Sequence, residues 1–131
     1  MKLTDHSHNR LLESMNHWRM PRDYADPMYN YLVHGFEPGS FFTSLLANDA
    51  IGAISHSHPS NTIPALKTVT GWMLDKCPPV AWGSYKKVEN WLELGAEPRR
   101  KTLEQHGLIY TEEEEIMLIL KNKHTVEPLF I

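Results

Sequence analysis

The sequence predicts a mainly α-helical protein: a compact, single-domain bundle of about five to six short helices, with a small C-terminal β-hairpin as an alternative for its last part. Apolar residues recur at spacings of three and four, which is the period of one helix face. Gly and Pro residues separate these segments, as they do at helix ends. The 131 residues, 41% of them hydrophobic, suit one domain (residues 1–131) with its own core.

Three helices are predicted in the first half of the chain. Residues 4–18 have one apolar face and a capping residue at their start. Residues 27–34 follow, with Asp26 as N-cap and Gly35 as a left-handed C-cap. A third helix, from residue 39 or 40 to about 54, carries an apolar stripe too wide for a helix with a fully wet outer face. We therefore expect it to be the central, buried helix.

The second half predicts a helix over residues 62–76 and another over 84–94, the latter capped by Ser84. Residues 98–106 fit a shorter helix. Thr111 and Glu114 have the spacing of a capping box, which favours a last helix through Leu120. The apolar run 116–120 and the segment 126–131 also fit the two strands of a hairpin, because short apolar runs cannot be assigned by periodicity alone.

Composition excludes several classes of protein. A net charge of −3 argues against non-specific binding to DNA or RNA, which requires a basic face. The single cysteine, Cys77, cannot form an internal disulfide and suits a reducing compartment. No apolar run is long enough for a signal peptide or a membrane span. We therefore expect a cytoplasmic protein without a membrane partner.

Several short motifs occur in a fixed order between residues 20 and 92. They are GFEPGSFFTSLLAND at 35–49, then Asn61, Trp82-Gly83-Ser84 and Trp91. This pattern resembles a family of small, mostly uncharacterised proteins from tailed phages and prophages. The family-like core would be residues 20–92, and 96–131 would be a C-terminal extension.

The resemblance implies a phage origin, a helical fold and a place in the host cytoplasm, but no activity. The family pattern has Ala-Asp before the asparagine, where this chain has His56 and His58. If an acidic residue matters there in the family, its role is altered in this protein.

The start of the third predicted helix is the strongest candidate ligand site. Free backbone N–H groups at a helix start favour anions, and Gly39 and Ser40 would let a phosphate approach. The alternative is an ordinary turn and N-cap. Polar, aromatic and basic residues elsewhere complete the candidate set. The candidate ligand-binding residues are Gly39, Ser40, Asn48, Asp49, Asn61, Trp82, Ser84, Arg99 and Arg100.

No catalytic residues, metal ligands or cofactor are predicted. His56 and His58, with Asp49 as a third ligand, lack a second cluster of metal-ligand spacing. Cys77 is followed by two prolines, and Ser40 lacks the strand-to-helix elbow of serine hydrolases.

Three functions remain open. The first is a non-enzymatic binder that counters host defence by sequestering a small anionic ligand such as a nucleotide signal, as a homo-oligomer with sites at its interfaces. The second is a protein–protein adaptor, or an inhibitor of a host enzyme, acting through an apolar face that includes Phe41 and Phe42. The third is a nucleic-acid module around Gly107, which the acidic run 112–115 opposes.

Overall fold

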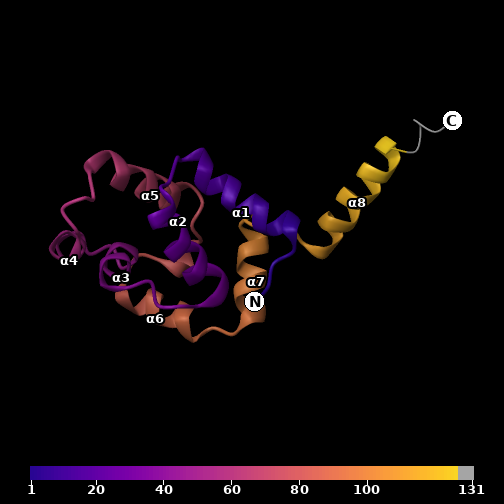
Figure 1. Cartoon of the computed structure of the whole chain (residues 1–131). Helices are drawn as coiled ribbons and strands as arrows, with labels where there is room; N and C mark the ends of the chain where they lie inside the picture. Colours follow the sequence, from indigo (N-terminus) through magenta and orange to yellow (C-terminus); the bar gives the residue numbers. More distant parts are fainter. Residues whose placement is uncertain (127–131) are drawn as a thin grey trace.

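A computed structural model describes residues 1–126 as a bundle of helices, with no strand in that part of the chain (Figure 1). A π-helical turn, η1, continues α2, and a 3-10 turn, η2, precedes α6. The elements in order are α1 Asp5–His17, α2 Arg22–Tyr29, η1 Asn30–His34, α3 Ser40–Leu46, α4 Ala50–His56, α5 Ile63–Asp75, η2 Pro79–Ala81, α6 Tyr85–Glu93, α7 Ala96–Gln105 and α8 Glu112–Val126.

Side-chain caps begin three of the predicted helices. The hydroxyls of Thr4, Thr62 and Ser84 accept hydrogen bonds from backbone N–H groups three residues further on. Each satisfies one of the donors that a helix start leaves free. The helices predicted over 4–18, 62–76 and 84–94 are confirmed to within a residue or two at each end.

The second predicted helix begins earlier than expected. Asp26 is not its N-cap, because α2 already begins at Arg22 and contains Pro27 in its interior. Tyr24, Ala25 and Met28 on this helix are buried. Burial of that face favours a continuous helix despite the backbone hydrogen bond that a proline removes. Gly35 ends η1 in the left-handed conformation (φ 66°), as predicted.

The third predicted helix is in fact two helices. Asn48 adopts a left-handed conformation (φ 61°), which breaks the chain between α3 and α4. The carboxylate of Asp49 then accepts a hydrogen bond from the Gly52 N–H at 2.9 Å and caps α4. The expected apolar stripe is also broken, because Leu46 is fully buried whereas Ile54 is 71% exposed. The prediction of a single buried helix is therefore wrong.

The core is formed by buried side chains of α1, α2, η1, α5, α6 and α7. Trp72 and Trp91 are its largest fully buried side chains. The Tyr31 hydroxyl donates to the Ala81 carbonyl at 2.7 Å, and the Trp91 indole donates to the Tyr31 carbonyl at 3.0 Å. These bonds join η1, η2 and α6. The other fully buried large side chains are Leu11, Met15, Met28, Leu32, Val33, Leu46, Leu103, Leu108 and Ile109.

The last described segment is a helix, so the hairpin alternative is wrong for residues 112–126. The predicted capping box is present: the Thr111 N–H donates to the Glu114 carboxylate at 3.0 Å, and the Glu114 N–H donates to the Thr111 hydroxyl at 3.1 Å. Most of the predicted second strand, 127–131, lies outside the described residues. Figure 1 shows α8 extending away from the rest of the bundle.

The predicted count of five to six helices is too low, since residues 1–126 contain eight α-helices. The break at Asn48 adds one, and α7, predicted as an optional short element, is a helix of 10 residues. None of the helices in this part of the chain is both long and apolar enough to cross a membrane.

Candidate functional site

The predicted ligand-binding residues do not form one site. Gly39 and Ser40 line a groove of about 410 Å³ between α3, α4 and α6. Asn48 and Trp82 line a second groove of about 320 Å³, beside α5. The other predicted residues line neither groove. One of them, Asp49, accepts a hydrogen bond from Tyr85, which lines the first groove.

The first groove is rich in hydroxyl groups. Gly39 is the N-cap of α3 and makes no side-chain cap bond, and α3 has only seven residues, so its dipole is weak. Glu37 places a carboxylate at the same groove. The residues that line it are Glu37, Gly39, Ser40, Thr43, Ser44, His56, Tyr85 and Leu92.

Asp49 is held beside this groove by two groups, one of which contacts a further hydroxyl. The Tyr85 hydroxyl donates to its carboxylate, the Gly52 N–H donates to it at 2.9 Å, and the Ser44 hydroxyl lies 3.2 Å from that of Tyr85. A Cβ on residue 52 would lie 2.3 Å from the Asp49 carboxylate, so a glycine is needed there. The bond from Tyr85, and then that from Gly52, lower the pKa of Asp49 below its ordinary value of 3.8. Asp49 therefore acts as an ionised helix cap.

Replacing Tyr85 by phenylalanine should raise the pKa of Asp49 towards 3.8. A carboxyl with a lowered pKa in the folded state stabilises the protein above its unfolded-state pKa, and this contribution is lost as the pH falls through the folded-state pKa. The Tyr85→Phe variant should thus lose less stability on acidification than the wild type. NMR titration of the Asp49 side-chain carbon measures the shift directly. An unchanged pKa in the variant would refute the assigned cause.

The second groove is mostly apolar. Trp82 is half-buried and Asn48 is exposed at the left-handed turn. Its lining residues are Leu45, Asn48, Thr70, Met73, Leu74 and Trp82. An amide beside an indole can bind a flat polar ligand, but the left-handed backbone already accounts for an asparagine at this position.

Three of the remaining predicted residues have structural contacts. Asn61 accepts a hydrogen bond from the Tyr24 hydroxyl at 2.7 Å, which ties the 57–62 loop to α2. Ser84 caps α6. Arg100 is half-buried, and its guanidinium lies 3.5 Å from the Lys2 carbonyl.

Arg99 is a buried structural residue. The residue is only 7% exposed. Its guanidinium donates to the Val33 carbonyl at 3.3 Å and to the Leu94 carbonyl. A Cβ on residue 35 would lie 2.8 Å from the guanidinium, so Gly35 is needed for its close approach as well as for the backbone turn. The guanidinium therefore links the end of η1 to the start of α7.

His56 and His58 each make a local contact. One ring nitrogen of His56 bonds to the Gly52 carbonyl at 2.9 Å, and one of His58 lies 2.8 Å from the Ser60 hydroxyl. Among the described residues, no three His, Cys, Asp or Glu side chains gather as a metal site would require.

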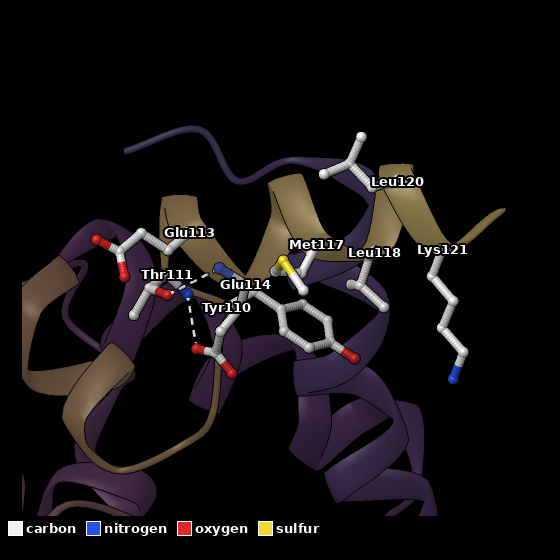
Figure 2. Close-up of a pocket in the computed structure, with 8 residues that line it drawn as sticks. All are labelled: Tyr110, Thr111, Glu113, Glu114, Met117, Leu118, Leu120 and Lys121. Atoms are coloured by element: carbon white, nitrogen blue, oxygen red, sulfur yellow. Dashed lines mark hydrogen bonds between the residues drawn. The ribbon is translucent and has the colours of Figure 1, made fainter. Parts of the chain in front are cut away.

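The largest of these grooves, about 790 Å³, runs along α8 and was not predicted from the sequence (Figure 2). The side chains of Met117 and Leu118 lie along it with the Tyr110 ring, and Leu120 points to another side of the helix (Figure 2). The residues that line it are Tyr110, Thr111, Glu113, Glu114, Met117, Leu118, Leu120 and Lys121. The sequence signal was the apolar run 116–120, which had been ambiguous between helix and strand.

The first turn of α8 is fixed to α1. The hydroxyls of Thr4 and Ser7 donate to the Glu115 carboxylate, the latter at 3.2 Å. Arg10 forms an ion pair with Glu114 at 3.5 Å. The Arg10 guanidinium also lies 4.3 Å from the centre of the Tyr110 ring, a cation–π contact. These contacts set the direction in which α8 leaves the bundle.

No family model, curated protein or solved structure matches the chain. The resemblance to tailed-phage proteins therefore stays a prediction.

The chemistry of the α8 groove suits binding of an apolar surface. Its walls are thioether, alkyl and aromatic groups, with carboxylates at the Glu113 end and an ammonium group at Lys121. A partner that binds this groove loses water along its apolar middle, and the charges at the two ends of the groove orient the partner.

Proposed function

We propose that the protein is a non-enzymatic interaction protein that binds another protein chain through α8. The observation that carries this proposal is the exposure of its apolar side chains. Met117 and Ile119 are 65% and 57% exposed, and Ile116 and Leu120 are 50% and 46% exposed. Isolated exposed apolar residues are ordinary, whereas contiguous ones mark interaction surfaces.

The apolar residues extend around the whole circumference of α8 in its middle part, residues 116–120. Five consecutive residues, 116–120, are apolar, and each is rotated by about 100° from the one before it. They therefore cover the full circumference of the helix. A helix that is apolar on all sides is ordinarily buried. The contacts with α1 described above hold its first turn, and a partner chain is the natural cover for the exposed apolar residues beyond it.

The double variant Met117→Glu, Leu120→Glu should abolish this binding without unfolding the bundle. Its matched control is Ile51→Glu, Ile54→Glu, which places two charges at exposed apolar positions of α4. Tagged proteins would be cross-linked in the native cell and their bound chains quantified by mass spectrometry. We expect the α8 variant to lose bound chains at least about tenfold, as removal of a buried apolar anchor does, and the α4 variant to keep them. Equal recovery by the two variants would refute a role for α8.

A second candidate function is sequestration of a small anionic ligand such as a nucleotide. The hydroxyls around Ser40 favour it, since they can donate to phosphate oxygens. Glu37 and the ionised Asp49 oppose it, because both place negative charge at or beside the groove. We therefore rank it second. Isothermal titration with mono-, di- and cyclic nucleotides tests it, with Ser40→Ala as the variant that should weaken any binding.

For its biological context we propose an accessory protein of a phage, in the host cytoplasm, that acts on host defence. The ordered motifs between residues 20 and 92 support this origin. A nucleic-acid module ranks third, because Glu112 and Glu113 are exposed where α8 would approach phosphates. A gel shift with duplex and single-stranded DNA at low salt is its test.

A further inference from the structure

We infer that the partner of α8 is α8 of a second copy of this chain, paired antiparallel about a two-fold axis at Met117. The inference rests on the proposed function, in which α8 is the docking surface, and it names the occupant of that surface. A symmetric pair of this kind uses the same patch on both copies, so the patch must be complementary to itself.

The charges on α8 have this self-complementarity. Glu113, Met117 and Lys121 are spaced by four residues, so each lies about 40° around the helix from the one before it, and all three line the groove. Met117 stands midway between a carboxylate and an ammonium group. A two-fold axis through Met117 therefore brings Glu113 of one copy opposite the partner's Lys121, and the reverse pair forms at the other end.

The other arrangements fit this surface less well. A parallel pair would place Glu113 beside Glu113 and Lys121 beside Lys121, and like charges in contact repel. An unrelated partner would need no particular relation between the two ends of the helix. The apolar residues between these ends on the groove side, Met117 and Leu118, supply the surface that each copy covers on the other.

The predicted pair is small, so its affinity should be modest. The charged ends of the face are eight residues apart, about 12 Å at the rise of an α-helix. Contacts much smaller than a standard interface are weak or transient, and dissociation constants in the micromolar range are usual for them. The dimer should therefore depend on protein concentration.

Cysteine cross-linking tests the position of the axis in the full chain. The native Cys77 is 5% exposed and burial raises the pKa of its thiol, so a new surface cysteine reacts alone. Met117→Cys should form a disulfide-linked dimer under mild oxidation at least about tenfold faster than the control Ile54→Cys, since an interface raises the effective concentration of paired thiols. Met117 and Ile54 are similarly exposed, at 65% and 71%. Equal rates for the two variants would overturn the inference.

Mixed cross-linking tests the orientation. Glu113→Cys mixed with Lys121→Cys should give a covalent heterodimer faster than either variant alone gives a homodimer. A parallel pair would instead link Glu113→Cys to itself. That result, like an absence of any preference, would overturn the antiparallel arrangement.

Charge reversal separates this inference from the proposed function. Sedimentation velocity should show wild-type mass rising towards twice the monomer mass with concentration. The single variants Glu113→Lys and Lys121→Glu should weaken the dimer, and the double variant should restore it. If wild type stays a monomer while another protein is still captured in an α8-dependent way, the self-pairing is overturned and the proposed function stands. If wild type stays a monomer and capture of another protein does not depend on α8, both the self-pairing and the proposed function are overturned.

Discussion

Replacing Arg99 by methionine should lower the free energy of unfolding by about 3–5 kcal/mol, which is a large part of the stability of a domain this size. Arg99 is 7% exposed, and its guanidinium donates to the Val33 carbonyl at 3.3 Å and to the Leu94 carbonyl. Hydrogen bonds from a charged group contribute about 1.5–3 kcal/mol each. Methionine keeps much of the packing of the side chain but makes neither bond, so both carbonyls lose this donor.

Arg100→Met is the matched control, because it removes the same charge one residue further along α7. Arg100 is half-buried and its guanidinium lies 3.5 Å from the Lys2 carbonyl. The change should cost at most about 0.5 kcal/mol, as most surface substitutions do. Urea denaturation followed by circular dichroism gives both values. Equal effects would mean that charge alone, and not the buried contacts, explains the role of Arg99.

Tyr31→Phe should lower the free energy of unfolding by about 2 kcal/mol. The Tyr31 side chain is fully buried, and its hydroxyl donates to the Ala81 carbonyl at 2.7 Å. Burial raises the pKa of Tyr31, so the hydroxyl keeps its proton and is a donor at neutral pH. Phenylalanine has nearly the same shape and leaves that carbonyl without its donor in a dry site.

Tyr29→Phe is the control for this second prediction. The Tyr29 hydroxyl bonds to a ring nitrogen of His8 at 2.8 Å, but the residue is only partly buried. Water can replace the lost bond there, and we expect a loss of about 0.5 kcal/mol. Calorimetry of thermal unfolding compares the stability of Tyr31→Phe with that of Tyr29→Phe. A Tyr31→Phe variant as stable as Tyr29→Phe would show that the Ala81 carbonyl finds another partner.

Features that depend on neighbouring residues were predicted well from the sequence. The cap of the first helix, predicted as Thr4 or Asp5 and found to be Thr4, the cap at Ser84 and the capping box of Thr111 and Glu114 were confirmed. Each is decided by a side chain and a backbone group within three residues, so the sequence contains the whole interaction.

Features that depend on tertiary packing were missed. The apolar spacing of residues 40–54 is compatible with one helix or with two, and the left-handed turn at Asn48 leaves no mark on that spacing. Pro27 indicated a helix start, but burial of Tyr24 and Met28 extends α2 through it. In both cases distant contacts outweigh a local preference.

The candidate site was predicted only in part. Arg99 was predicted as a ligand-binding residue, and no local pattern shows that it turns inward towards Val33. The apolar run 116–120 was noted, yet its exposure follows from the direction in which Thr4 and Ser7 hold Glu115. Residues more than 100 positions apart set that direction, and a single sequence does not reveal such pairs.

The π-helical turn η1 determines how the chain tolerates changes of length. A π-helix accommodates one more residue per turn than an α-helix, so deleting one residue between Asn30 and His34 would allow α2 to continue as an ordinary helix. Tyr31, Leu32 and Val33 of this turn are fully buried, however, so a deletion would remove or displace a core side chain. Length variation in this protein should therefore be found in its loops and not in this five-residue turn.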